Sequence, residues 1–363
     1  MADKKPIVIL CGTIFYSFVL TKIWILFYPS KILTLCSMVD VSIVIVCMNR
    51  PENLTPCLDS IREYTKVSYE TFVVAYLFTP ENLSWLRENY PWVTIVESHE
   101  IRGFSENNNL ALRLAKGKYC FVVNDDTWME MPVIDALVAD FNTLPETAAV
   151  VSPAIVYPSG KRQTCGRGPW SARRYALHYL HMVDESRSTR WTWRTGLFPT
   201  YSLNGACFLI KMAAFRDVGW FDETYFFTPE DVALGMLLSQ KGYGVYADSN
   251  IRIVHLAQVS TSSMETVIKP VRVRGSLILY SSLRHLNSPQ GIAEMSQFTY
   301  FLLGAFVWTF ESLRSIKYKF KRLRGGMTER DMIMETTARN VRRVVFSGLL
   351  PRDIFKLYMN ELA

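Results

Sequence analysis

Several patterns that would point to a particular chemistry are missing from this 363-residue sequence. No Cys-x-x-Cys pair occurs among the seven cysteines, which are odd in number and mostly lie in apolar runs. We therefore expect buried thiols in a reducing compartment, not a disulfide framework. Internal repeats and low-complexity tracts are absent, which excludes repeat architectures. No base-stacking or groove-reading motif accompanies the net charge of +7, so nucleic acid is not expected as a partner.

The N-terminal segment is apolar but carries no cleavage signal. Residues 6 to 28, "PIVILCGTIFYSFVLTKIWILFY", are long enough to span a bilayer, with only Lys22 interrupting them. Because no small-residue cleavage site follows, a signal anchor fits better than a removed signal peptide. A domain start is nevertheless indicated at Met38, where "MVDVSIVIVCMNR" begins. Two alternatives stay open for residues 1–37: a single-pass anchor or an upstream extension.

The first half of the remaining chain alternates between strand and helix patterns. Apolar, β-branched runs at 41–46, 71–77, 93–98 and 119–123 predict strands. Helical patterns lie between them, one of them "SENNNLALRLAKG", which we expect to end at Gly117. This alternation predicts a mostly parallel sheet with flanking helices. Ligands of such sheets bind beyond the carboxyl ends of the strands, where Asn49, Arg102, Asp125 and Asp126 fall.

The second half combines irregular and helical stretches. Residues 157–203 lose periodicity and fill with Gly, Arg, Trp and Tyr, which predicts a functional loop. Patterns then predict a strand at 205–210, a helix at 229–242 ended by Gly242, and a strand at 251–255. Residues 38–265 are expected to form the main domain, and residues 266–363 a helical region. In that region "FTYFLLGAFVWTF" (298–310) runs into the basic "ESLRSIKYKFKRLR" and predicts an interfacial helix on a membrane surface.

Adjacent carboxylates stand where the strand "CFVV" ends. Asp125 and Asp126 suit Mg²⁺ or Mn²⁺ carrying a diphosphate, because one or two carboxylates complete a coordination shell of phosphate and water oxygens. The alternative is an Asp-rich turn that caps the next helix. Glu230 and Asp231, taken alone, indicate a helix start. Likewise His255 alone fits a core histidine.

Taken together, these motifs resemble one enzyme family. "VVNDDT", "RGFSENNNLAL" and the thirty-residue block "GACFLIKMAAFRDVGWFDETYFFTPEDVAL" are similar to motifs of the family 2 inverting glycosyltransferases, in particular their bacterial rhamnosyltransferase-like branch. The resemblance covers roughly residues 41–260. It implies a GT-A fold, which is Rossmann-like with a mostly parallel central sheet. Two positions depart from the family pattern: Ala233 replaces an acidic residue on the acceptor side, and Arg102 replaces an Asn.

The resemblance also implies roles for individual residues. Asp126 and His255 would hold a divalent metal, Mg²⁺ or Mn²⁺, on the diphosphate of the donor. Asp231 would be the general base for an acceptor hydroxyl, with Glu230 orienting it or the acceptor. The loop of residues 157–203 would select the acceptor and the sugar. The residues expected to bind the nucleotide-sugar donor are Val46, Met48, Asn49, Arg50, Glu97, Arg102, Gly103, Asn108, Asn124 and Asp125.

The implied reaction is inverting transfer of a sugar from a dTDP-, UDP- or GDP-linked donor to a glycan acceptor. A lipid-linked oligosaccharide at the cytoplasmic face of the cell membrane is the expected acceptor, in cell-surface polysaccharide synthesis. Two alternatives remain. A nucleotidyltransferase would want a Gly-rich loop after the first strand, which "CMNRPENL" does not provide. A non-catalytic binding protein of the same fold is made conceivable by Ala233.

Overall fold

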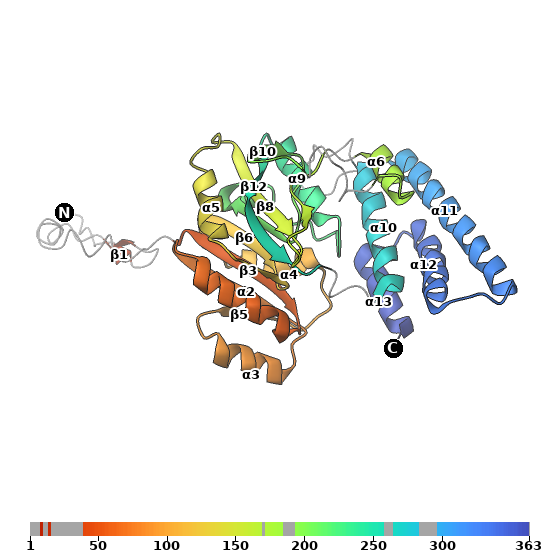
Figure 1. The fold of residues 1–363 in the computed structure, drawn as a ribbon, viewed down its shortest axis with the longest axis horizontal. Coiled ribbons are helices and arrows are strands. Elements are labelled where there is room, and N and C mark those ends of the chain that lie inside the picture. Colours follow the sequence, from red (N-terminus) through yellow and green to blue (C-terminus); the bar gives the residue numbers. More distant parts are fainter. Residues whose placement is uncertain are drawn as a thin grey trace, which may run out of the picture. The chain divides into compact units, whose positions relative to one another are not determined.

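A computed structural model describes residues 8–9, 14–15, 39–168, 171–183, 193–257, 264–282 and 296–362 (Figure 1). The chain divides into two units, Met1–Val39 and Asp40–Ala363. In the first unit, β1 (Val8–Ile9) and β2 (Ile14–Phe15) form an antiparallel pair. The anchor expected at residues 6–28 lies mostly outside the described residues. Within the described helices, none combines the length and apolarity that a membrane span requires.

A mixed ten-stranded sheet forms the centre of the second unit. Its main path runs β10-β12-β8-β11-β6-β3-β4-β5, with β7 paired to β12 and β9 to β8. The neighbours among β3, β4, β5 and β6 pair in parallel, as predicted, whereas β11 is antiparallel to both of its neighbours. The bounds are β3 (Val41–Met48), β4 (Tyr69–Tyr76), β5 (Thr94–Ser98), β6 (Tyr119–Asn124), β7 (Thr127–Trp128), β8 (Ala148–Val156), β9 (Arg162–Thr164), β10 (Leu197–Thr200), β11 (Cys207–Lys211) and β12 (Gly244–His255).

Helices cover both faces of this sheet because its central strands are apolar throughout. Alternate side chains of β3 point to opposite faces: Ile43 and Ile45 enter one core cluster and Val44 another. The first cluster is closed by α2 (Pro51–Tyr64), α3 (Pro80–Asn89) and α5 (Val133–Asp140). The second is closed by α4 (Phe104–Leu112), α8 (Met212–Asp217) and α9 (Glu230–Gln240).

Two sequence-based predictions about this unit were wrong. Helix α4 ends at Leu112, before Gly117. Gly117 is instead required by close packing, since a Cβ atom there would lie 2.5 Å from the backbone nitrogen of Ser42. Residues 157–203 are not an irregular loop throughout, because they contain β9, α6 (Ala172–Tyr179) and β10. By contrast, Gly242 does follow α9 with a φ of 82°, as expected of a residue that ends a helix.

The C-terminal region is helical, as predicted. It comprises α10 (Glu265–Ser282), α11 (Gln297–Leu323), α12 (Glu329–Val345) and α13 (Pro351–Leu362). One core cluster joins α10, α11 and α12 to α6 and to Val232 and Ala233 of α9. Gly275 allows α10 to approach closely, since a Cβ atom there would lie 2.9 Å from the carbonyl oxygen of Thr228. The helical region is therefore packed directly against the segment that leads into α9.

Candidate active site

Strand pairing brings Asp126 and His255 together. The two-residue strand β7 follows the carboxylate pair and pairs with the end of β12, so that Thr127 lies opposite His255. The backbone N–H of Leu256 also donates to the carbonyl oxygen of Asp126 at 3.0 Å. As a result, His255 Nε2 lies 3.2 Å from Asp126 Oδ1, and both side chains are largely buried.

Gln163 orients the imidazole of His255. Its amide oxygen lies 3.0 Å from His255 Nδ1, and its amide nitrogen donates to the backbone carbonyl of His255. An amide oxygen only accepts hydrogen bonds, so Nδ1 carries the proton and donates it. In the neutral imidazole, Nε2 then presents its lone pair toward Asp126. This is the arrangement found where a histidine binds a metal and a neighbour fixes its other nitrogen.

Asp125 occupies different surroundings from Asp126. Burial raises the pKa of Asp125 to about 6, and the charge of Asp126 adds to the increase, whereas the nearby Cys47, Asn53 and Arg50 oppose it. Cys47 lies near the end of β3, Arg50 just before α2, and Asn53 in the first turn of α2. The two carboxylates, although adjacent in sequence, thus have different neighbours: Asp126 faces His255 and Asp125 faces the start of α2.

The donor set at Asp126 fits a divalent cation that is shared with a substrate. Across the described parts of the chain, no group of three or more His, Cys, Asp or Glu side chains surrounds a common point. Among these described residues, the pair that fits the predicted metal ligands is Asp126 and His255, one carboxylate and one imidazole. A hard cation with several open positions for diphosphate and water oxygens suits such a pair.

Asp231 is held at the first turn of α9 by three hydrogen bonds. Its Oδ2 atom accepts from Arg167 Nη1 at 3.0 Å and from the Gly205 backbone N–H at 3.1 Å. Its Oδ1 atom accepts from the Val232 backbone N–H at 2.7 Å. A carboxylate offers about four lone-pair positions, so one remains, on Oδ1. Asp231 therefore keeps a single acceptor position for an incoming proton.

Glu230 is buried beside Asp231, and its carboxyl group has a raised pKa. Burial raises the pKa of Glu230 to about 8, and the charge of Asp231 raises it further. Among the residues whose placement is described, none donates a hydrogen bond to its Oε2 atom. The charge of Arg272 opposes this increase without cancelling it, so Glu230 is mostly protonated at neutral pH.

A short stretch of backbone connects the two acidic positions. The Asn124 N–H donates to the Ala206 carbonyl at 2.9 Å, across the pairing of β6 with β11. The next residue back, Gly205, donates its N–H to Asp231. The carboxyl end of β6 and the start of α9 consequently lie on one edge of the sheet. The structure thus places Asp126, His255, Asp231 and Glu230 along that edge.

The residues predicted around the nucleotide lie where β3 ends. Val46 is half-buried and Met48 is 39% exposed. The Asn49 side chain accepts from the Thr79 backbone N–H at 3.0 Å and from Asn82 at 2.8 Å, so it also holds the start of α3. Arg50 exerts its charge on Asp125. Donor binding by these residues stays a prediction.

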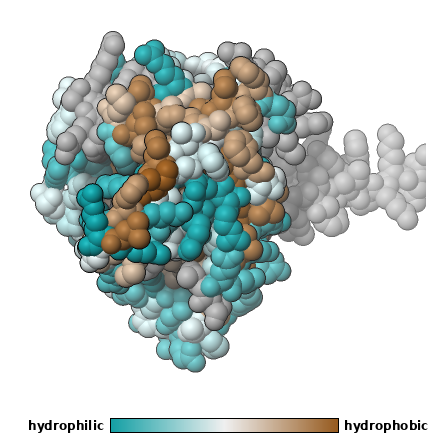
Figure 2. All heavy atoms as spheres, turned by 90° about the vertical axis from the view of Figure 1, so that its right-hand side faces the viewer, coloured by the Kyte–Doolittle hydropathy of each residue, from teal (hydrophilic) through white to brown (hydrophobic). Residues whose placement is uncertain are grey.

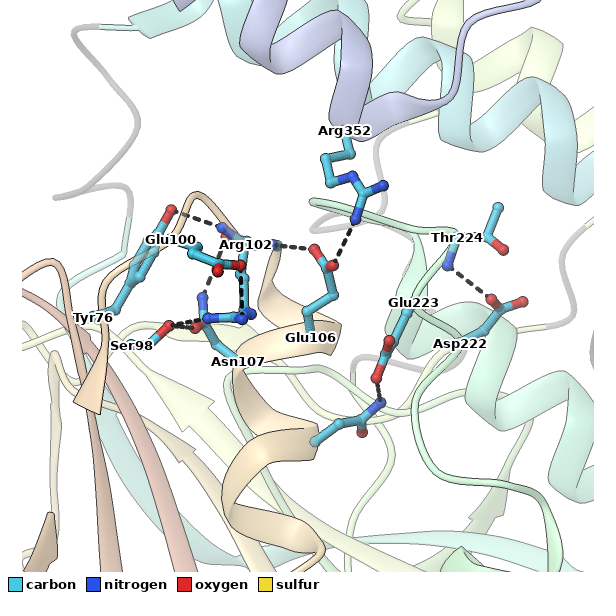
Figure 3. A network of polar contacts seen from close by, with 12 residues as sticks. Tyr76, Ser98, Glu100, Arg102, Glu106, Asn107, Asp222, Glu223, Thr224 and Arg352 are labelled. Carbon is cyan, nitrogen blue, oxygen red and sulfur yellow. Dashed lines mark hydrogen bonds and ion pairs between the residues drawn. The ribbon is translucent and has the colours of Figure 1, made fainter. Parts of the chain in front are cut away.

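Arg102 and Glu97 are engaged with protein groups near the end of β5. Figure 3 shows the Arg102 guanidinium pointing at Glu100 and Ser98, at 2.9 Å and 3.3 Å. Glu97 pairs with Arg87 at 2.6 Å and His99 at 3.1 Å on the protein surface. Both residues lie in β5 or just after it. In the sheet, β3 and β4 stand between β5 and β6, the strand that Asp126 follows. Their predicted contact with the donor is not tested by this geometry.

Packing explains Gly103 and the three asparagines that follow it. A Cβ atom on Gly103 would lie 2.3 Å from the carbonyl oxygen of Phe226, so only glycine lets α4 approach the segment before α9. Asn107, Asn108 and Asn109 are buried inside α4 and do not cap it. The side-chain amide of Asn108 donates a hydrogen bond to the Phe104 carbonyl oxygen at 2.9 Å. Its binding of the nucleotide sugar stays a prediction.

Beyond Asp231 lies a cavity of about 680 Å³. Its lining comes from the start of α9, from α6 and from α10, and includes Arg167, Tyr175, Tyr179, Lys269 and Arg272. Sequence reasoning had placed an acceptor-selecting element in residues 157–203 but did not single out these side chains. Ala233 is buried in the apolar cluster with α10 and α11. At this position, where the family has an acidic residue, the Ala233 side chain packs against the helices instead.

Comparisons with known proteins agree with this geometry. Residues 42–219 match the family model described as glycosyl transferase family 2. The chain contains a family 2 glycosyltransferase domain. It is 27% identical over 59% of its length to the O-antigen biosynthesis protein RfbC of Myxococcus xanthus, covering 17% of that protein. It is 29% identical over 38% of its length to the N-acetylglucosaminyl-diphospho-decaprenol L-rhamnosyltransferase of Mycobacterium tuberculosis, covering 47% of that protein.

The fold has a solved counterpart. A crystal structure of GalNAc-T7 with UDP, GalNAc and Mn²⁺ superposes on 72% of this glycosyltransferase chain and 54% of its own, with a TM-score of 0.50 and 15% identity. This likeness establishes the GT-A fold that the sequence predicted. The alignments span less than half the length of either curated relative named above.

Proposed function

We propose that this protein transfers a sugar from a nucleotide-diphosphate sugar to a hydroxyl of a glycan acceptor, with inversion, in cell-surface polysaccharide synthesis. The observation that carries the proposal is the shared sheet edge. The Asp126 and His255 pair lies there with Asp231, and a cavity large enough for a sugar acceptor adjoins Asp231. A donor site beside a fixed base is what a single displacement needs, because no covalent nucleophile takes part.

On the donor side, Asp126 and His255 would hold a divalent cation, Mg²⁺ or Mn²⁺. When bound, the cation supplies Lewis-acid stabilisation of the charge that develops on the leaving diphosphate. Asp125, Asn49 and Arg50 flank this position at the ends of β6 and β3, where ribose and base would lie. The nucleotide and the sugar are set by contacts that the fold alone does not specify.

On the acceptor side, Asp231 takes the proton of the attacking hydroxyl at the remaining position on Oδ1. Arg167 and Gly205 fix Oδ2 and so keep the carboxylate from rotating. Glu230 next to it has a pKa raised to about 8 by burial and is therefore mostly uncharged at neutral pH. The rhamnosyltransferase relative is named for a diphosphate-linked lipid acceptor, and we extend that acceptor class, a saccharide on a lipid diphosphate, to this protein.

A lipid-linked acceptor requires that the protein reach a membrane surface, and α11 has a face suited to contact with lipid. Its outer face carries large apolar side chains that recur at helical spacing and are exposed, namely Phe298, Phe301, Leu302, Leu313, Ile316, Phe320 and Leu323. Figure 2 shows hydrophobic and hydrophilic atoms side by side on the surface of the helical region. Basic residues gather in the second half of α11, at Lys317, Lys319, Lys321, Arg322 and Arg324. Charge and apolarity together favour an anionic lipid surface at the cytoplasmic face of the cell membrane.

Flotation with lipid vesicles tests this membrane contact. The protein should float with vesicles containing phosphatidylglycerol and less with neutral phosphatidylcholine vesicles. Replacing Leu313 and Phe320 by Ser should abolish flotation while leaving the melting temperature unchanged, because both side chains are exposed. Equal flotation of the variant, or no preference for the anionic lipid, would contradict a role for α11. Chains starting at residue 40 separate this contact from any contribution of residues 1–39.

Donor binding tests the proposed reaction itself. Calorimetry with UDP-, dTDP- and GDP-sugars, in Mn²⁺ or in chelator, should show binding of one nucleotide class that depends on the metal. Asp126→Ala should remove that binding, and Arg343→Ala, which removes an exposed ion pair with Glu361 in the helical region, should not. Binding that ignores both the metal and Asp126 would rule out the proposed donor site.

A further inference from the structure

The cavity beyond Asp231 contains an arginine, Arg272, on which the charges of Glu230 and Glu265 act, although none of the described carboxylates forms an ion pair with it. Arg167 is bound to Asp231, and Lys269 lies 3.1 Å from Glu311. Arg272, also in the lining, has no hydrogen bond and no ion pair with any residue that the structure describes. Its guanidinium instead lies over the ring of Phe227, 4.9 Å from the ring centre. An arginine held this way in a cavity is available to a ligand.

The position of Arg272 is fixed from two sides. Phe227 belongs to the segment that leads into Glu230 and Asp231, and Gly275, one turn further along α10, lets the helix pack against that same segment. A guanidinium stacked on a ring keeps its N–H donors in its own plane. Those donors match the paired oxygens of a phosphate or carboxylate. The contact with Phe227 thus holds the Arg272 guanidinium against the segment that leads into Asp231, with its donors available to an oxyanion.

The neighbours of Arg272 favour a phosphate over a neutral group. Lys269 lies three residues earlier, on the same face of α10, and its ammonium lines the same cavity. Glu311 offsets part of that charge, but it is shared with Arg314 at 3.0 Å and with the Tyr179 hydroxyl at 2.6 Å. Glu265, the remaining carboxylate of the lining besides Asp231, stands at the exposed start of α10. The inner wall of the cavity is therefore cationic.

We propose that Arg272, assisted by Lys269, binds the phosphate oxygens of a diphosphate-linked acceptor and so places the acceptor hydroxyl at Asp231. The assignment rests on the proposed transfer reaction and names the substrate group that the acceptor side recognises. Arg272 is a binding residue for the non-reacting end of the acceptor. The sugar of the acceptor lies between it and Asp231, within the same 680 Å³ cavity.

Calorimetry with geranyl diphosphate, in chelator so that no metal assists, tests this subsite. We expect wild type to bind it, Arg272→Ala to weaken binding at least tenfold, and Arg272→Lys to restore part of the loss, since lysine keeps the charge without the planar fork. Arg352→Ala is the matched control, because Arg352 pairs with Glu106 away from this cavity (Figure 3). Equal binding by Arg272→Ala and wild type, or an equal loss in Arg352→Ala, would overturn the proposal.

Two further measurements separate the sources of the effect. Flotation with phosphatidylglycerol vesicles should be unchanged in Arg272→Ala; a parallel loss would assign Arg272 to lipid headgroups and refute an acceptor subsite. Donor binding with Mn²⁺ should also be unchanged. If geranyl diphosphate binding depends on Arg272 while wild type binds no nucleotide sugar, the anion subsite stands and the transfer reaction falls. The reverse pattern removes the subsite and leaves the reaction.

Discussion

The two halves of the candidate site are built by different means. On the donor side, Asp126 and His255 meet because β7 pairs with β12, so the backbone hydrogen bonds of the sheet position them. On the acceptor side, the wall facing Asp231 consists of side chains from α6 and α10, and the buried carboxylate of Glu311 in α11 joins Tyr179 of the first to Lys269 of the second. The difference teaches that one half follows from the register of strands and the other from long-range side-chain packing.

The largest effect should come from the residue where the two halves meet. Asp231→Asn keeps the size of the side chain but removes the proton acceptor, so we expect transfer to fall about a thousandfold. Donor affinity should stay at the wild-type value, because Asp231 lies on the acceptor side. Turnover and calorimetry on the same preparations check both statements. Normal turnover would remove Asp231 from the chemistry.

The packing of the helical wall depends on the buried carboxylate of Glu311. Glu311→Ala leaves Lys269 and Arg314 without their buried partner, and we expect the free energy of unfolding to fall by about 3–5 kcal/mol. Glu361→Ala removes an exposed ion pair with Arg343 and should cost at most about 1 kcal/mol. Urea titrations of both variants measure these values. Similar losses in the two would mean that Glu311 is no special support of the wall.

The raised pKa of Glu230 makes the free energy of unfolding depend on pH. Its pKa rises from 4.5 to about 8 on folding, so the folded state holds the proton more tightly than the unfolded state. The stability that wild type has at low pH is therefore lost as the pH rises from about 4.5 to about 8. Glu230→Gln should not show this loss, and should gain on wild type by roughly 4 kcal/mol between low pH and pH 8. Melting curves from pH 5 to 9 that run parallel for both proteins would contradict the assignment.

The smallest effect concerns the support of the donor side. Gln163→Leu removes the acceptor that fixes His255 Nδ1, and we expect Mn²⁺-dependent donor affinity to fall roughly tenfold. The fold should persist, since Gln163 lies in the short strand β9. Manganese titrations followed by donor calorimetry give the shift. A Mn²⁺ affinity that does not change would show that strand pairing alone suffices to orient His255.

Much of the donor side could be predicted from sequence, because local patterns determine it. β-branched runs specify the strands, and the carboxylates follow a strand directly, so Asp126 falls at a sheet edge whatever the rest of the chain does. Gln163 could not be found this way, since it lies 92 residues from His255 and no periodicity links them. The role expected for Glu97 rests on resemblance, and that of Arg102 also on its place after a strand; the structure shows both side chains bound to neighbouring side chains.

The acceptor side was less accessible to sequence reasoning for a physical reason. Arg167, Lys269 and Arg272 come from segments whose patterns indicate a loop and a helix, and only the tertiary fold brings them to one cavity. The early end of α4 is similar, since Gly117 packs against Ser42 and does not stop the helix. Helical periodicity predicted α10 and α11, but not which of their faces would be buried.

Gly275 sets a condition on the exchange of parts between proteins of this kind. Its missing side chain lets α10 rest on Thr228 and Pro229, so the helices that form the cavity wall are seated on the very segment that presents the base. A graft of foreign helices onto this catalytic domain would carry a new acceptor preference only if it brought a similarly bare position at that point. A bulkier residue at that position would push the helix away from Thr228 and Pro229 and shift Asp231. The graft would then disturb the base as well as change the acceptor that reaches it.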